Sequence, residues 1–261
     1  MITENPRKYG EPPYSVVLIH GGPGAPGEMA PVAKEVSKGV GVLEPFQTKN
    51  TIRGQVEELK QQIKENVDVP VVLVGWSWGA WLSFIFSAEN SDLVKKLILI
   101  SSGPFKTEYA QKIMPTRLAH LSAKERERAN VLMNILQTGN ANDAVLQEFG
   151  ELMSQADAFD SIKDKEKEEK VEVQSDIYES VWREAETMRK SGELLKYGEK
   201  ITCPVVVIHG DYDSHPFEGV KEPLSKILKN IRFFLLKDCG HHPWLERKAR
   251  EQFYTILRQE L

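Results

Sequence analysis

One serine in the chain has a setting that could make it a nucleophile: Ser77, in the run Gly75-Trp76-Ser77-Trp78-Gly79. A serine hydroxyl attacks a carbonyl only when a base accepts its proton, and the oxyanion that forms needs fixed N–H donors. Glycines two positions before and after the serine permit the strained strand-to-helix turn that presents such a nucleophile. The pattern predicts a hydrolytic nucleophile and requires an oxyanion loop, a base and an acid elsewhere.

The sequence His-Gly-Gly-Pro-Gly at positions 20–24 follows an early apolar run and is the predicted oxyanion loop. Backbone N–H groups of such a loop can face the serine, and the residue after the nucleophile normally supplies a second donor. Gly22 and Trp78 are therefore the candidate oxyanion donors. Gly21 and Trp76 adjoin these positions, and we expect them to line the substrate pocket.

Acidic and imidazole side chains follow two later apolar runs, in the chain order serine, acid, base. Asp211 and Asp213 end the first of these runs, and His241 and His242 follow the second. In a parallel sheet both loops lie at the carboxyl ends of strands, where open α/β sheets keep their active sites. A histidine from one loop would accept the proton of Ser77, and a carboxylate from the other would orient the imidazole and stabilise its cation.

The elements that must position these residues are short apolar strands alternating with helices. The expected strands are residues 15–19, 40–43, 70–74, 96–100, 205–209 and 231–236. The expected helices are residues 28–37, 51–67 with Thr51 as N-cap, 80–88 and 243–257. This alternation predicts the α/β class, with a mostly parallel sheet and helices on both faces. We expect His209, inside a strand, to be a core histidine.

Residues 105–200 interrupt this alternation, because they are helix-rich and strongly charged and contain no clear strand. We predict a helical cap inserted into a core domain formed by residues 1–104 and 201–261. The insertion carries a net charge of −4, which is the formal charge of the whole chain, and residues 145–180 carry −7. The charged run at 163–170 is expected to be the solvated part of a lid helix.

The bulk composition excludes several function classes. A net charge of −4 and an isoelectric point near 6.0 do not provide the basic face that nucleic acids require. The first residues lack the apolar stretch of a secretory signal, and no run approaches the roughly 18 apolar residues that span a bilayer. Cys203 and Cys239 form no metal-like cluster. We expect a cytoplasmic enzyme that needs no metal or cofactor and acts on a small molecule or short peptide; the oligomeric state stays open.

The serine turn, the loop before it and the order of the later acid and base resemble the α/β-hydrolase family over the whole chain. His-Gly-Gly-Pro-Gly at 20–24 is similar to the proline iminopeptidase group, which removes an N-terminal residue, typically proline, from peptides. The resemblance implies Asp213 as the acid, in the pattern Gly-x-x-Asp, and His241 as the base, directly after a glycine. Trp76 stands where that group usually has glycine, which implies a reshaped acyl pocket.

The same resemblance leaves supporting roles for the two neighbours of the acid and the base. Asp211 would shape its loop, and His242 would cap or pack against the helix that follows. The family's dehalogenases and epoxide hydrolases need an aspartate at the elbow, so Ser77 excludes both activities.

Three functions remain open at this stage. The first is a peptidase-like serine hydrolase of peptides or amides with a free amino end, and the conceivable amine binders are Asp157, Asp160, Asp176 and Glu179. The second is a carboxylesterase of small apolar esters, with apolar walls drawn from Trp76, Trp78, Trp81 and Phe84, although the last two also suit a helix core. The third is a ligand-binding receptor on a hydrolase scaffold, since a fold alone does not fix a function.

Overall fold

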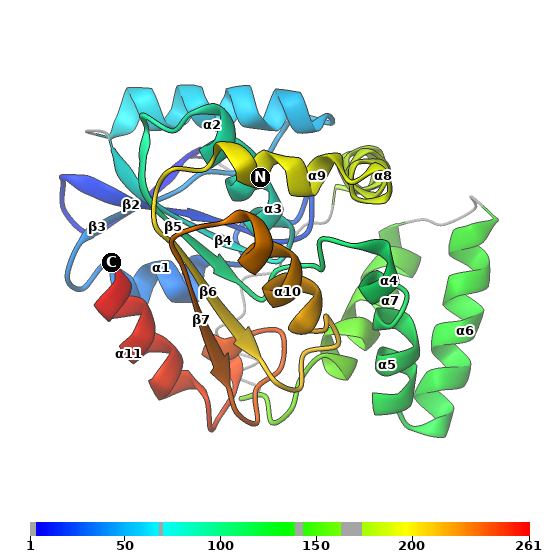
Figure 1. The fold of residues 1–261 in the computed structure, drawn as a ribbon. Helices are drawn as coiled ribbons and strands as arrows, with labels where there is room; N and C mark the ends of the chain where they lie inside the picture. Colours follow the sequence, from blue (N-terminus) through cyan, green and yellow to red (C-terminus); the bar gives the residue numbers. More distant parts are fainter. Residues whose placement is uncertain (1–3, 68–69, 139–142, 163–173) are drawn as a thin grey trace.

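A computed structural model describes residues 4–67, 70–138, 143–162 and 174–261. Within these residues a seven-stranded sheet has the order β1-β3-β2-β4-β5-β6-β7 (Figure 1). Its strands are β1 (Arg7–Tyr9), β2 (Tyr14–Ile19), β3 (Gly41–Glu44), β4 (Val71–Trp76), β5 (Val94–Ile100), β6 (Val205–Gly210) and β7 (Ile231–Leu236). Only β1 runs antiparallel to its neighbour. The mostly parallel sheet is confirmed, and β1 is an edge strand that the sequence did not predict.

Helices cover both faces of the sheet, as predicted (Figure 1). They are α1 (Ala30–Val36), α2 (Ile52–Asn66), α3 (Trp78–Glu89), α10 (Glu218–Ile227) and α11 (Arg250–Glu260). Side chains of β4 alternate between the two layers, because successive residues of a strand point to opposite faces. Leu73 packs with α2 and α3, whereas Val72 and Trp76 pack with α1 and α11. The side chain of Thr51 accepts the N–H of Gly54, which confirms the predicted N-cap of α2.

The predicted helix 243–257 was wrong in its first half. The chain forms a short 3₁₀ turn (Pro243–Leu245) and enters α11 only at Arg250. The reason is tertiary: Leu245 accepts the backbone N–H of Ile162, and residues 161 and 246 form an isolated β-bridge. This segment therefore pairs with the insertion instead of completing a helical turn.

The inserted region contains α4 (Thr107–Ala110), α5 (Ile113–His120), α6 (Ala123–Gln137), α7 (Asp143–Ala156), α8 (Ser175–Ser191) and α9 (Glu193–Lys196). Helices α5, α6 and α7 stand together at one side of the molecule (Figure 1) and share a small core of their own that includes Ala129 and Met153. By contrast, α8 inserts Val181 and Ala185 into the same cluster as α3. Part of the predicted cap therefore covers the sheet. The charged run at 163–170 lies outside the described residues.

The two cysteines lie apart from any cluster of metal ligands found among the described residues. Cys239 is buried and Cys203 half-buried, and both are free thiols. Burial raises the pKa of each thiol, so both are protonated at neutral pH and poorly nucleophilic. In the described part of the chain, no helix combines the length and the apolar character that crossing a membrane requires.

Candidate active site

Ser77 occupies the turn between β4 and α3 in a strained conformation. Its φ of 54° and ψ of −117° lie outside the regions that side-chain-bearing residues ordinarily adopt. The flanking glycines make the turn possible, because a methyl group at Gly75 would lie 2.2 Å from the carbonyl oxygen of Gly79. A methyl group at Gly79 would lie 2.4 Å from the carbonyl oxygen of His20. Backbone contacts therefore fix the position of the serine.

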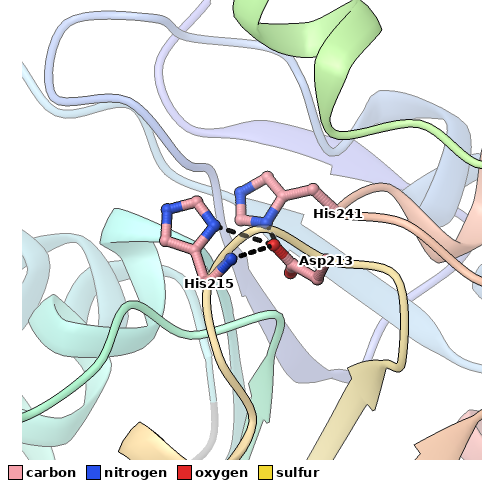
Figure 2. Close-up of side chains that lie close together, drawn as sticks. All are labelled: Asp213, His215 and His241. Atoms are coloured by element: carbon pink, nitrogen blue, oxygen red, sulfur yellow. Dashed lines mark hydrogen bonds and ion pairs between the residues drawn. The ribbon is translucent and has the colours of Figure 1, made fainter. Parts of the chain in front are cut away.

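A hydrogen-bonded line joins Ser77 to residues that lie far along the chain. His241, in the loop after β7, has its Nε2 3.0 Å from Ser77 Oγ. Its Nδ1 lies 2.7 Å from Asp213 Oδ2, and Figure 2 shows these two side chains together with His215. Burial by itself would raise the pKa of Asp213, but His241 and His215 beside it hold that pKa well below its usual range. The ionised carboxylate accepts Nδ1–H, which leaves the Nε2 lone pair to accept the serine hydroxyl.

The competing acid and base have other contacts. Asp211 is exposed, and its Oδ1 accepts the N–H of Cys239 at 3.3 Å, so it ties together the two loops. The ring of His242 packs against Trp76, with ring centroids 4.6 Å apart, and against Trp244. Burial lowers the pKa of His242 to about 3, which keeps it neutral. Asp211 therefore holds its loop as expected, whereas His242 packs on β4 and on the 3₁₀ turn, because the helix that follows begins only at Arg250.

A network of neutral groups fixes the loop at 20–24. His20 Nδ1 donates to the carbonyl of Gly21 at 2.8 Å, and its Nε2 accepts the N–H of Gln47 at 3.3 Å. Burial lowers the pKa of His20 to about 4, so the ring is uncharged. Gln47 Oε1 also accepts Trp78 Nε1–H at 2.8 Å, which links the loop to the start of α3. Gly22 has a φ of +28°, and the Trp78 amide belongs to the first helical turn, where N–H groups have no acceptor within the helix.

The positions of Trp76 and Gly21 correct their predicted role as pocket lining. Trp76 is 3% exposed, and its Nε1 donates to the carbonyl of His241 at 2.9 Å. A methyl group at Gly21 would lie 2.4 Å from the Trp76 ring. The reason is the alternation along β4, which directs this indole toward the layer of α1 and α11. Trp76 supports the base from within the core.

The other aromatic residues near the elbow are core residues as well. Trp78, Trp81 and Phe84 are at most 2% exposed and belong to the cluster that joins α2, α3 and α8. Trp81 donates its Nε1–H to the carbonyl of Gly103 and stacks on Trp182 of α8 at 5.8 Å. These rings anchor α8 to the sheet. The helix-core alternative for Trp81 and Phe84 is therefore confirmed, and Trp78 is buried in the same cluster instead of forming a pocket wall.

Asp157 lies closest to the base among the four acids considered as amine binders. Its carbonyl accepts the N–H of His241 at 2.8 Å. Its carboxylate is 3% exposed, and both oxygens accept Arg117 Nε–H at 2.9 Å. Burial alone would raise the pKa of Asp157, but the guanidinium outweighs burial and lowers it. This carboxylate is already neutralised by a buried cation and is a poor site for a second one.

The remaining three acids lie further out. Asp160 is 3.4 Å from Arg247 Nε, and Asp176 and Glu179 are exposed on the first turns of α8. The start of α8 nonetheless touches the loop at 20–24, because Gln174 N–H donates to the carbonyl of Gly24 at 2.8 Å.

Sequence reasoning missed two residues that hold Asp213 and the loop of His241 in place. His215 donates to Asp213 from both its backbone N–H and its ring, at 2.9 and 2.8 Å. Glu246 is 1% exposed, and its carboxylate accepts the N–H groups of Gly240, Phe159 and Asp160 at 2.8–3.0 Å. The signal for His215 was its place two residues after the acid. Glu246 carried no local signal, because it lay within a predicted helix.

Among the described residues, Asp213, His215 and His241 also form a group whose ligand atoms lie within 4.8 Å of one another. That spacing would suit a metal ion, but both carboxylate oxygens already accept imidazole N–H groups at 2.7–2.8 Å. The cluster therefore has the geometry of a hydrogen-bonded acid–base array.

Comparison with known proteins identifies the family to which the fold belongs. A family model described as alpha/beta hydrolase fold matches residues 45–248. No curated protein sequence matches the chain. Among solved structures, VinJ superposes with a TM-score of 0.69 at 18% identity, over 98% of this chain and 95% of the other. A Paleococcus ferrophilus monoacylglycerol lipase gives 0.63 at 18% identity over 97% and 96%, and a Mycobacterium smegmatis proline iminopeptidase gives 0.63 at 16% over 97% and 92%. At these identities the structural likeness shows the fold.

Proposed function

We propose that this chain, which belongs to the alpha/beta hydrolase family, is a serine hydrolase that cleaves small acyl substrates through an acyl-enzyme. The observation that carries the proposal is the continuous hydrogen-bonded line from Ser77 Oγ through His241 to Asp213, at 3.0 and 2.7 Å. A nucleophile, its base and the group that orients the base have the mutual geometry that acyl transfer requires.

In the first half-reaction, Ser77 Oγ attacks the carbonyl carbon of the substrate while its proton passes to His241 Nε2. The carbonyl oxygen becomes an oxyanion, which accepts hydrogen bonds from the N–H groups of Gly22 and Trp78. The intermediate then collapses, and the leaving group takes the proton from His241. Asp213 stabilises the imidazolium throughout and stays ionised.

In the second half-reaction, a water molecule gives its proton to His241 and attacks the acyl carbon. The tetrahedral intermediate expels Ser77 Oγ, which recovers the proton from His241. The products are a free acid and the regenerated enzyme, so no metal or organic cofactor enters the balance.

We favour esters as the substrate class. Asp157, the acid closest to the base, is neutralised by Arg117 and does not offer a free carboxylate to an ammonium group. An ester substrate needs no such anchor, since its carbonyl is bound by the oxyanion donors alone. The sequence, with its acidic insertion, had placed peptides or amides before esters as substrates, and this order is now reversed.

A second candidate, an aminopeptidase similar to proline iminopeptidases, is favoured by one contact. The acidic start of α8, with Asp176 and Glu179, rests on the oxyanion loop through the hydrogen bond from Gln174 to Gly24. Carboxylates at that position could attract the amino end of a peptide.

A panel of short-chain p-nitrophenyl esters and of Pro- and Ala-naphthylamides tests the two candidates side by side. We expect ester turnover that is abolished by Ser77→Ala, with labelling of Ser77 by a fluorophosphonate. Turnover of the naphthylamides alone, with a KM raised in the Asp176→Asn/Glu179→Gln variant, would replace the ester proposal by the second candidate. Absence of both turnover and labelling would favour a receptor.

A further inference from the structure

The carboxylate of Asp213 serves two imidazoles. Its Oδ2 accepts His241 Nδ1–H at 2.7 Å, and its Oδ1 accepts His215 Nδ1–H at 2.8 Å (Figure 2). The two rings stack on each other, with centroids 4.4 Å apart and planes 25° from parallel. The acyl-transfer steps above use only one of these rings, because His241 holds the hydrogen bond to Ser77. The second ring needs its own explanation.

His215 is fixed from two directions. Its backbone N–H donates to Asp213 Oδ1 at 2.9 Å, so the residue wraps around the acid. Its carbonyl accepts Nε2–H of His209 at 2.7 Å, and His209 is a fully buried residue of β6. The backbone of His215 is therefore held both to Asp213 and to the central sheet, and the ring can turn away from Asp213 only by breaking its own Nδ1–H hydrogen bond to Oδ1.

The protonation state of His215 follows from its partner. An ionised carboxylate can only accept, so His215 presents Nδ1–H to Asp213. Burial lowers the pKa of His215, although the neighbouring carboxylate opposes this effect, and the ring is neutral at neutral pH. A neutral donor stabilises the carboxylate without contributing a second positive charge beside the imidazolium that forms on His241 during acyl transfer.

We propose that His215 is a positioning residue that fixes the carboxylate of Asp213 and limits how much of its negative charge His241 experiences. The proposal rests on the proposed function, because it assigns His215 a role in setting the proton affinity of that base. A hydrogen bond to one oxygen of a carboxylate reduces the charge available at the other. His241 should therefore release its proton more readily than it would beside a carboxylate that lacked the second donor.

Other ionisable groups face this cluster and are common to every variant considered. They are Arg117 and Asp157 from the cap, His209 from β6, Glu218 from α10 and His242 from the base loop. Arg117 and Asp157 compensate each other, and His209 and His242 are held neutral by burial, which lowers the pKa of both. Substitution of His215 therefore removes one hydrogen-bond donor to Asp213 and leaves the other ionisable groups around the cluster unchanged.

Two variants separate the donor from the ring. His215→Phe keeps an aromatic ring against His241 but has no N–H, whereas His215→Asn keeps a side-chain N–H near Asp213 but has no ring. For ester hydrolysis, we expect His215→Phe to move the acid limb of the kcat/KM profile upward by roughly half to one pH unit. Its kcat should fall roughly tenfold and its KM change less than about twofold, because the loss acts on the base and not on substrate binding. His215→Asn should restore the acid limb toward that of the unaltered protein.

A purely structural role would lower stability in both variants and leave the acid limb in place. Coincident acid limbs in all three proteins, or the same displacement in both variants, would overturn the proposal. A second readout does not depend on turnover: the ring titration of ¹⁵N-labelled His241, followed by NMR in the Ser77→Ala background. We expect the midpoint pH of the His241 titration to be higher in Ser77→Ala/His215→Phe than in Ser77→Ala. In Ser77→Ala/His215→Asn it should return toward the value of Ser77→Ala. If the His241 midpoint shifts in the NMR experiment but the protein with Ser77 intact hydrolyses no substrate, the proposed function is rejected and the role of His215 is kept. If the protein with Ser77 intact is active but the NMR midpoints do not shift, the role of His215 is rejected and the proposed function is kept.

Discussion

Ser77, the proposed nucleophile, and His241, the proposed base, meet at one hydrogen bond, but the structure holds the two residues by different means. Around Ser77, backbone contacts at Gly75 and Gly79 leave no room for another arrangement, and the nearby oxyanion loop is fixed by the neutral ring of His20. Around His241, by contrast, the fixing groups include buried carboxylates. A steric device is insensitive to pH, whereas buried charges depend on their partners. We therefore expect substitutions around His241, the base side of the site, to cost more than substitutions around Ser77 and the loop at 20–24, the oxyanion side.

Buried acidic residues also connect the loop of His241 to the inserted helical region, residues 105–200. Glu246 gathers N–H groups from Gly240 in the base loop and from Phe159 and Asp160 in the inserted region. Asp157 contributes its carbonyl to the N–H of His241. The geometry of the base is thus set partly by residues outside the sheet.

The largest expected effect is on activity and distinguishes the two adjacent histidines. His241→Ala should reduce kcat/KM for an active ester by about 10³-fold or more, because Ser77 loses its base. His242→Ala removes a neutral ring that packs on Trp76, so it should cost stability but leave the folded protein active. Rate measurements on both variants, with circular dichroism to monitor folding, check this. Retained activity in His241→Ala together with lost activity in His242→Ala would reverse the assignment of the base.

The next effect is on stability and tests the charged character of the base side. Arg117→Met leaves the buried carboxylate of Asp157 without its cation, which should cost about 3–5 kcal/mol in the free energy of unfolding. The cost should be greatest near neutral pH. It should shrink in acid, because the folded-state pKa of Asp157, now lowered by Arg117, would rise in the variant and the carboxyl would take up a proton there.

The control for this experiment removes both charges. Arg117→Met/Asp157→Leu should recover most of the lost stability, since neither charge is left buried alone. Urea unfolding curves at pH 7 and pH 5, followed by tryptophan fluorescence, measure all three proteins. A double variant as unstable as Arg117→Met would show that the pair acts through shape and not through charge.

The smallest effect tests the neutral character of the oxyanion side. Glu28 Oε2 is buried without a hydrogen-bond partner among the described residues, and it lies 3.2 Å from where a methyl group at Gly21 would be. Burial, with help from nearby Glu44, raises the pKa of Glu28 from 4.5 to about 8. The folded state therefore favours the neutral acid and loses stability as the pH rises from 4.5 through 8.

Glu28→Gln keeps the shape of that neutral acid at every pH. It should match the unaltered protein near pH 4.5 and exceed its stability by about 1–3 kcal/mol at pH 8. Melting temperatures at the two pH values check this, and the comparison within each protein controls for other effects of acid. A difference that does not depend on pH would show that folding leaves the pKa of this carboxyl unchanged.

The parts of the structure that depend on local signals were predicted from the sequence, whereas the parts that depend on long-range contacts were not. The predicted strand at 231–236 has the bounds of β7, and the N-cap Thr51 was correct, because apolar runs and caps are local signals. The first half of the helix predicted at 243–257 was wrong, because Glu246 binds N–H groups of the insertion instead of continuing a helix. The pocket role expected of Trp76 failed for a related reason, since the sequence does not say which face of β4 the substrate occupies.

The sequence by itself determined the alternation of strands and helices, the strained turn at Ser77, and the order in which an acid and a base follow it. These are properties of short segments, set by apolar periodicity and by the conformations that glycine permits. Only the tertiary structure decided that Asp213 is shared by two histidines, that Arg117 already occupies the carboxylate of Asp157, and that Glu246 joins the loop after β7 to the inserted helical region. The physical reason is that a buried charge is compensated by whichever groups the folded chain brings to it, and such partners lie at sequence separations that no local pattern records.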